Sequence, residues 1–172
     1  MDKYIISIIS ITVGAVVSYL ITTYRNRVQA TFELHNEFHS DTMLKTRARA
    51  FECVKKYSLK TFSNLESLQK DEDLFRSLWV VTDFYQRLWF SIKYNRIDKK
   101  MAPEMFGELF YWWYIASFQN MLLPTDWISS DKISNLKNWF DNNTSIEEKN
   151  IWCTRAEKFL ESQEIKRSLE ES

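Results

Sequence analysis

Glycine and proline are nearly missing from this chain of 172 residues, which contains only two of each. Folds rich in β-strands need many tight turns, and tight turns draw on these two residues. Phosphate-binding loops and the nucleophile turn of many hydrolases also need several glycines, and neither motif occurs in the sequence. The composition therefore predicts long helices joined by a few polar turns.

Cysteine is also scarce, and Cys53 and Cys153 form no CxxC or zinc-ligand spacing. Both fall in segments with helical patterns, so we expect two reduced, half-buried thiols. Aromatic residues, by contrast, make up 16% of the chain and include seven tryptophans and twelve phenylalanines. Each buried ring removes a large apolar area from water, so the chain has ample material for a hydrophobic core.

Charged residues are absent between Tyr4 and Tyr24. A helix of that length spans about 31 Å, which matches the roughly 30 Å thickness of membrane hydrocarbon. A cleaved signal peptide would show a clearly basic start and a small-residue cleavage site. Here the start carries one base and one acid, and the apolar run ends in Thr-Thr-Tyr-Arg. We therefore predict a transmembrane anchor at residues 1–24 and a cytosolic α-helical domain at residues 25–172.

Arg25 and Arg27 directly follow the predicted anchor. Because basic residues stay on the cytosolic side, we expect a single-pass protein of the inner (cell) membrane with its N-terminus outside. Residues 25–60 hold eight basic and four acidic side chains, whereas residues 61–172 hold fourteen basic and eighteen acidic ones. The basic segment 25–60 either touches anionic lipid or forms an ordinary solvated helix face.

Small residues recur at every fourth position of the predicted anchor, at Ser10, Gly14, Ser18 and Thr22. On a helix they share one face, and small side chains let two membrane helices approach closely. The pattern favours self-association through Ser10, Gly14 and Ser18, although such residues are also common in single spans.

Hydrophobic periodicity predicts a bundle of about five helices after the anchor, and hence an all-α fold. We expect the anchor helix to continue to about residue 38, where Ser40 or Asp41 caps a second helix over 42–57. Arg47 is predicted to lie outside the inner stripe of that second helix. The predicted stripe comprises Met43, Leu44, Ala48, Phe51 and Val54.

Two aromatic helices are expected after a polar connection at 58–70. The first begins at an acidic run, has apolar residues at alternating spacings of four and three, and ends at Asn95. The second begins near Pro103, is apolar almost all round and ends at Pro124. Such a helix lies in a core, at an oligomer contact or at a membrane surface, and we expect the core.

Two further helices complete the expected bundle. One covers about 126–140, and the last begins at a capping box formed by Ser145 and Glu148. The tail beyond Gln163 is highly charged, and we expect it to fray.

The aromatic helices and the turn between them carry a resemblance to a known family. The segments concerned are residues 83–92 (DFYQRLWFSI), 95–98 (NRID) and 104–113 (EMFGELFYWW). They resemble small bacterial membrane proteins grouped as domain of unknown function 4760, in which one N-terminal span precedes a helical domain. The similarity covers about residues 32–118, and Asn95 stands where a glycine is usual. The resemblance implies this architecture and no activity.

Few residues of the sequence indicate a catalytic or metal-binding site. His35 and His39 share a helix face at a spacing that can hold a metal, but the order is H-x-E-x-H and no third ligand is marked. We therefore expect an interfacial histidine pair. Glu104 and Glu108 also share a face, and we expect them at a salt-bridged or solvent-facing edge.

The sequence thus predicts no catalytic residue, no cofactor and no metal ion, and the net negative distal part disfavours nucleic acid. We expect a non-enzymatic, membrane-anchored adaptor that binds the lipid bilayer and either another protein or itself. The alternative is a membrane-perturbing effector of a bacterial stress or phage-defence system. A third, enzymatic hypothesis rests on His35 and His39.

Overall fold

The computed structural model describes the backbone of residues 2–57, 71–122 and 129–170. Within these ranges the protein has six α-helices, one π-helical segment and no strand, which confirms the predicted all-α fold. The predicted connection at 58–70 and the predicted stop at Pro124 lie outside the described residues. The elements are α1 (Asp2–Phe38), α2 (Asp41–Tyr57), α4 (Glu72–Lys93), α5 (Met101–Trp113), the π-helical segment η1 (Tyr114–Leu122), α6 (Ser130–Asn143) and α7 (Ile146–Glu170).

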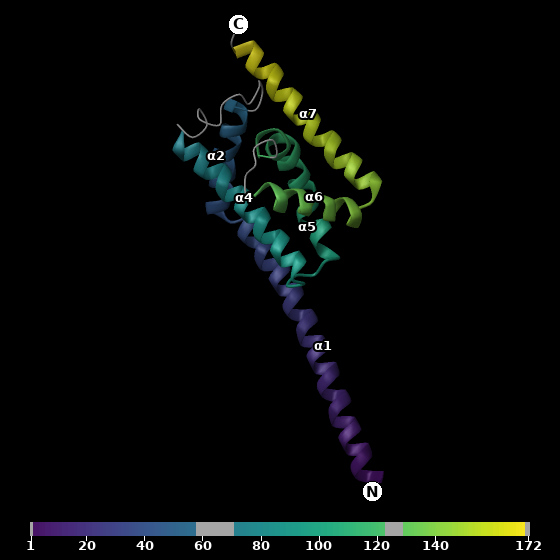
Figure 1. The fold of residues 1–172 in the computed structure, drawn as a ribbon. Coiled ribbons are helices and arrows are strands. Elements are labelled where there is room, and N and C mark those ends of the chain that lie inside the picture. The colour runs from purple at the N-terminus through teal and green to yellow at the C-terminus, as the bar shows by residue number, and fades with distance from the viewer. Residues whose placement is uncertain (1, 58–70, 123–128, 171–172) are drawn as a thin grey trace.

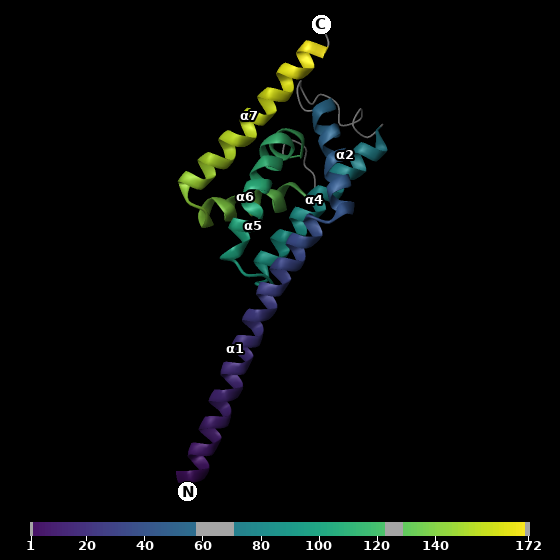
Figure 2. The ribbon, with the colours of Figure 1, turned by 180° about the vertical axis from the view of Figure 1, so that it is seen from behind.

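Helices α2 to α7 form a body from which α1 projects. Figures 1 and 2 show that only the C-terminal part of α1 runs along this body, so the two chain termini lie at opposite ends of the molecule. Within the body, α2 packs against α4, α5 against α7, and α4 against α6. The turn between α4 and α5 lies at the end from which α1 emerges, whereas α2 and α7 reach toward the other end.

Aromatic rings from several helices build the core. Tyr85 in α4 is fully buried, and its ring centroid lies 5.4 Å from Phe110 in α5 and 5.7 Å from Phe118 in η1. Phe110 in turn stacks on Phe140 of α6 at 4.9 Å. Aromatic pairs of this kind contribute about 0.5–1.5 kcal/mol beyond the area they bury. The prediction that both aromatic helices belong to the core is confirmed.

The predicted inner stripe of α2 is partly wrong. Leu44 and Ala48 are exposed rather than buried. The guanidinium of Arg47, which the pattern places outside, lies 4.3 Å from the ring centroid of Phe38. A charged side chain can occupy an apolar stripe when its planar guanidinium stacks on an aromatic ring, and hydropathy does not detect this. The buried apolar side chains of α2 are Met43, Ala50, Cys53 and Val54.

Both cysteines are free thiols, and Cys53 is more deeply buried than its pattern predicts. Burial, followed by the charge of Asp71, raises the pKa of Cys53 to about 12. The thiolate is the reactive form of cysteine, so a thiol that stays protonated is a poor nucleophile. Cys53 therefore serves as a packing residue between α2 and its neighbours.

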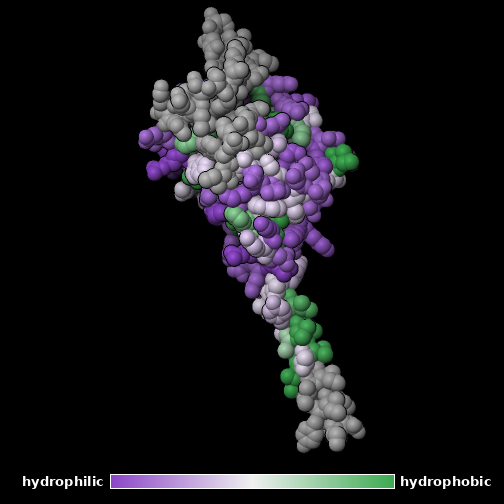
Figure 3. All heavy atoms as spheres, in the orientation of Figure 1, coloured by the Kyte–Doolittle hydropathy of each residue, from purple (hydrophilic) through white to green (hydrophobic). Residues whose placement is uncertain are grey.

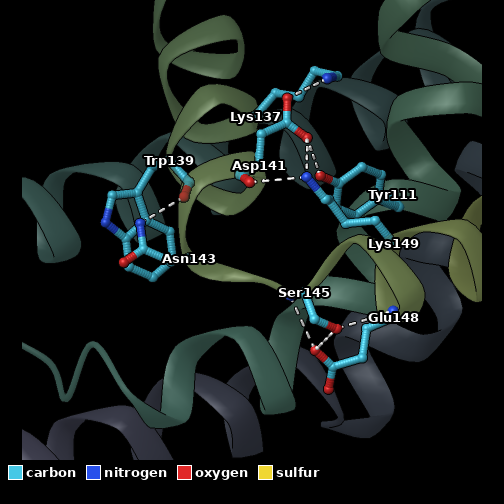
Figure 4. A network of polar contacts seen from close by, with 8 residues as sticks. All are labelled: Tyr111, Lys137, Trp139, Asp141, Asn143, Ser145, Glu148 and Lys149. Carbon is cyan, nitrogen blue, oxygen red and sulfur yellow. Dashed lines mark hydrogen bonds and ion pairs between the residues drawn. The ribbon is translucent and has the colours of Figure 1, made fainter.

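Capping residues define the helix ends as the sequence predicts. Ser40 Oγ accepts a hydrogen bond from the Met43 amide at 3.3 Å at the start of α2. Asn95 adopts a left-handed φ of 57° just after α4, a conformation that asparagine tolerates better than most residues. Ser145 and Glu148 form the predicted capping box, in which each side chain accepts from the other's backbone amide, at 3.1 and 3.2 Å (Figure 4).

The last two helices differ from their predicted extents. Residues 126–128 of the predicted 126–140 helix lie outside the described residues, and α6 continues to Asn143. The backbone of α7 is helical to Glu170, whereas we expect fraying beyond Gln163. Glutamate, lysine, arginine and leucine dominate that stretch, and their high helix propensity explains the longer helix.

Asp141 near the end of α6 connects three helices through its carboxylate and its backbone oxygen (Figure 4). It accepts hydrogen bonds from the Tyr111 hydroxyl of α5 and from Lys137 Nζ at 2.5 Å. Lys149 of α7 donates to the Asp141 backbone oxygen at 2.9 Å. Burial alone would raise the pKa of Asp141, but the hydrogen bonds from Lys137 and Tyr111 and the nearby charges hold it below its ordinary value of 3.8.

The lowered pKa of Asp141 predicts that its contribution to stability depends on pH in the acidic range. Because its pKa is lowered in the fold, the contribution is complete above the unfolded pKa and is lost as the pH falls through the folded pKa. We expect the difference in unfolding free energy between the chain and its Asp141→Asn variant to shrink from about pH 6 to about pH 2.5. Urea unfolding of the full chain in mild detergent measures it, with the exposed Asp131→Asn as control. A difference that stays constant with pH would contradict the prediction.

Candidate functional site

The projecting part of α1 is apolar around its whole circumference. From residue 11 onward, its large hydrophobic side chains are each 47–70% exposed. Successive residues of a helix are about 100° apart, so these side chains cover every side of it. Figure 3 shows the hydrophobic residues on this projection and a mainly hydrophilic body. We call residues 11–24 the apolar sleeve, and its large exposed members are Ile11, Val13, Val16, Val17, Tyr19, Leu20, Ile21 and Tyr24.

The predicted transmembrane anchor is only partly covered by the described residues. Among the residues that the structure describes, no helix is long and apolar enough to cross a membrane. The side chains of residues 1–10, where the predicted span begins, lie outside the described part of the chain. The membrane span over 4–24 therefore stays a prediction.

The segment of α1 that follows the sleeve is fixed to the α4–α5 turn. Thr31 is fully buried, and its Oγ1 accepts a hydrogen bond from the Asp98 amide at 2.9 Å while donating to the Arg27 carbonyl at 2.7 Å. The side-chain oxygen of Asn95, oriented toward Arg27, accepts from both terminal guanidinium nitrogens at 3.1 and 2.7 Å. These contacts hold the turn against α1 just above the sleeve.

A second contact joins α1 to α4. Arg87 donates two hydrogen bonds to the Glu37 carboxylate, at 3.1 and 2.5 Å, and also pairs with Asp83 at 3.4 Å. Hydrogen bonding to the Glu37 carboxylate is the main cause of the raised pKa of Arg87. Both partners are more than 40% exposed, so the pair contributes at most about 1 kcal/mol. The bidentate geometry of this ion pair is more important than its energy, because two parallel hydrogen bonds restrict rotation of α1 against α4.

The last residue of α1 enters the core. Phe38 is fully buried, and its ring centroid lies 4.4 Å from Phe84 and 5.5 Å from Tyr85 of α4. The guanidinium of Arg47 covers the same ring. We call these contacts, with those of Arg27, Thr31 and Glu37, the junction. The junction involves three successive turns of α1, so the sleeve continues directly from a helical segment that packs against the body.

The buried hydroxyl of Thr31 makes the junction testable. Thr31→Val keeps the shape of the side chain but leaves the Asp98 amide without its acceptor, so we expect unfolding free energy to fall by about 1–2 kcal/mol. Thr46→Val is the matched control, because the Thr46 hydroxyl donates only to the Thr42 carbonyl of its own helix. Urea unfolding of the full chain in detergent compares the two, and equal effects would contradict the assigned role of Thr31.

The structure brings His35 and His39 together, with ring centroids 4.3 Å apart, and places His35 beside Phe106 of α5. Burial, the neighbouring His35 and the charge of Arg47 lower the pKa of His39. Within residues 2–57, 71–122 and 129–170, no group of three or more histidine, cysteine, aspartate or glutamate side chains could hold a metal ion. The nearby guanidinium also opposes a bound cation, so the geometry favours the interfacial pair.

The small-residue face of α1 is open in the single chain. A Cβ atom added at Gly14 would meet nothing within 4 Å, and Ser18 is exposed. The side chain of Ser10 lies outside the described part of the chain. Self-association through this face is neither required nor blocked by the fold, and it stays a prediction.

The two glutamates of α5 lie at an edge, as expected. Glu108 pairs with Arg155 of α7 at 2.8 Å, and Glu104 is exposed. Between them lies a feature that sequence reasoning missed: a Cβ at Gly107 would lie 2.5 Å from the ring of Trp152. Glycine here allows the tryptophan of α7 to pack directly on the backbone of α5. The lone glycine within an aromatic helix is the signal that could have indicated this contact.

Comparison with known proteins adds no family or function. No protein-family model matches the chain, and neither the curated proteins nor the solved structures contain a match. The function therefore has to be inferred from the residues themselves. The apolar sleeve and the junction that fixes it to the body are the candidate functional site.

Proposed function

We propose that this protein is a membrane-anchored helical adaptor whose apolar sleeve lies in a bilayer and whose body lies at the cytosolic surface. The observation that carries the proposal is the exposed apolar circumference of residues 11–24, on a helix whose following turns are hydrogen-bonded to a folded body. Continuous exposed apolar surfaces of this size mark lipid or protein contacts. Arg25 and Arg27 at the end of the sleeve favour a cytosolic body, because basic residues resist translocation.

A binding role, rather than a catalytic one, accounts best for the polar groups of the body. Asp141 connects α5, α6 and α7, Arg87 connects α4 with α1, and Thr31 connects α1 with the α4–α5 turn. Each of these groups joins helices, and its hydrogen bonds are made to other groups of the fold. The adaptor would hold a protein partner, or a second copy of itself, at a fixed distance from the membrane.

Extraction of membranes from cells that express the full chain tests the anchor. Alkaline carbonate removes proteins held only at the membrane surface, so we expect the chain to stay in the pellet until detergent is added. Release by carbonate would contradict the anchor.

Affinity purification from the detergent extract then tests the adaptor role. We expect the chain to be recovered with a protein partner, or with a second copy of itself, in fixed stoichiometry.

The open face at Gly14 supports one alternative, a membrane-perturbing effector that assembles through its anchor helices. Expression with a permeability dye separates the two functions. Leakage that Gly14→Leu abolishes, and that the neighbouring Ala15→Leu leaves intact, would favour the effector. The absence of leakage at matched expression would favour the adaptor.

The family resemblance is a hypothesis that fits this proposal. It rests on the aromatic helices and on the turn at 95–98, which in this chain holds α1 through Asn95 and Asp98. A turn with that role would explain a shared helix–turn–helix pattern in proteins with one N-terminal span. The resemblance to domain of unknown function 4760 supplies no activity, so the proposed adaptor role depends on the residues alone.

A further inference from the structure

The end of the body that faces the sleeve carries exposed basic side chains. Within the described part of the chain, none of them forms an ion pair. Asp98, the acidic residue within the turn, accepts hydrogen bonds from the amides of Lys100 and Met101 at 2.8 and 3.2 Å, so its carboxylate caps the start of α5. The exposed cations are Arg25 of α1, Lys93 at the end of α4, and Arg96, Lys99 and Lys100 in the turn.

The junction fixes how far this turn lies from the sleeve. Asn95 contacts the guanidinium of Arg27, and Tyr24, the last residue of the sleeve, precedes Arg27 by about 4.5 Å along the helix axis. The headgroup layer on each side of the hydrocarbon is about 5–8 Å thick. If the sleeve ends at the hydrocarbon boundary, the α4–α5 turn therefore lies at the depth of the lipid headgroups.

Aromatic side chains at the same end fit this depth. Tyr94 is 59% exposed, and its ring stacks on that of Phe90 with centroids 6.2 Å apart. Tyr24 on the sleeve is 60% exposed. Tyrosine favours the membrane interface, because its ring prefers lipid while its hydroxyl remains hydrated.

In the sequence, the excess of basic residues extends over the whole of residues 25–60. In the structure, the described basic residues of this segment lie toward two different ends of the body. Arg25 lies at the end of the sleeve, whereas α2 runs toward the opposite end of the body (Figures 1 and 2). The cations of α2 are therefore far from the level of the turn. The cations of residues 93–100 are distant from the anchor in the sequence. The hydrogen bonds of Asp98 and Asn95 to α1 nevertheless bring them near the sleeve.

We propose that Arg25 and the basic side chains of residues 93–100 form a collar that binds the anionic headgroups of phospholipids around the anchor. The proposal rests on the membrane anchor proposed above and adds that the body lies directly against the lipid surface. Arginine and lysine donate hydrogen bonds to phosphate oxygens, and each cation near the surface adds attraction to anionic lipid. The collar would set the tilt of the body and so the direction in which a partner is presented.

Hydrogen–deuterium exchange of the full chain in lipid nanodiscs tests the collar. The nanodiscs contain either pure phosphatidylcholine or an equal mixture of phosphatidylcholine and phosphatidylglycerol. We expect backbone amides of residues 94–100 to exchange at least about threefold more slowly in the anionic discs, because bound headgroups shield the turn. The difference should disappear in about 1 M salt, which screens exposed charges.

Two variants with the same change of charge complete the test. The Arg96→Gln, Lys99→Gln, Lys100→Gln triple variant should lose the difference between the two kinds of disc. The Lys45→Gln, Arg49→Gln, Lys158→Gln triple variant, with exposed positions on α2 and α7, should retain it. The collar proposal would be wrong if the wild-type turn amides exchanged equally fast in both kinds of disc, or if both variants lost the difference between the discs. Neither result would contradict the membrane anchor. A chain that elutes separately from the discs would instead overturn the anchor.

Discussion

Replacing Val13 and Val16 by lysine is expected to move the full chain out of the membrane fraction. Both positions lie near the middle of the predicted span over 4–24, and their side chains are 56% and 52% exposed in the sleeve. Lysine at the centre of a membrane helix costs about 2.5–3.5 kcal/mol, so the two substitutions together oppose insertion by about 6 kcal/mol. Part of this cost is recovered when the long side chains reach toward the surface, but most of it remains.

Quantitative immunoblotting of membrane and supernatant fractions measures this effect. Ile146→Lys with Ile151→Lys is the matched control, because it adds the same charge at exposed apolar positions of α7, which are 74% and 43% exposed. We expect the control to remain in the membrane fraction. If both double variants distribute like the wild type, the sleeve is not buried in lipid.

Phe38→Ala is expected to lower the unfolding free energy by about 3–5 kcal/mol, as for other large aromatic residues removed from a core. The Phe38 ring is fully buried against Phe84, Tyr85 and the Arg47 guanidinium, so truncation leaves a cavity where α1 meets the body. A loss of this size is a large part of the 5–15 kcal/mol that is typical of a whole domain. The variant should therefore unfold under mild conditions.

Urea unfolding in detergent, followed by near-ultraviolet circular dichroism of the aromatic core, measures the loss. Phe32→Ala on the same helix is the control, because its ring is 48% exposed and its truncation should cost less than about 1.5 kcal/mol. Similar losses for the two variants would mean that the end of α1 is not part of the core, and the junction described above would be wrong.

Local signals make several of the helix ends predictable from the sequence. Ser40, Asn95 and the Ser145–Glu148 capping box each act within four residues of a helix end, so their effect can be read without knowing the fold. The apolar period of α4 was equally informative, because one side of that helix faces the core along its whole length. The predicted all-α fold follows from such signals alone.

The contacts of the junction were not predictable in the same way. Thr31 and Asp98 are hydrogen-bonded although they are 67 positions apart, and nothing in either local sequence indicates the pairing. The sequence pattern places Arg47 in solvent because charge usually lies outside, whereas in the structure a ring beneath its guanidinium compensates for burial. Similarly, periodicity does not distinguish the π-helical segment at Tyr114–Leu122 from a continued α-helix. Each of these features depends on how separate helices meet.

We propose that the apolar sleeve lies in lipid and that the chain leaves the hydrocarbon near Arg25. Nitroxide labels at positions 13, 20 and 29, introduced as single cysteines in a chain lacking Cys53 and Cys153, measure this directly in nanodiscs. We expect collisions with oxygen to dominate at position 13 and to decline at position 20, while a water-soluble nickel complex reaches only position 29. Equal access of the nickel complex to all three positions would show that the sleeve does not lie in lipid.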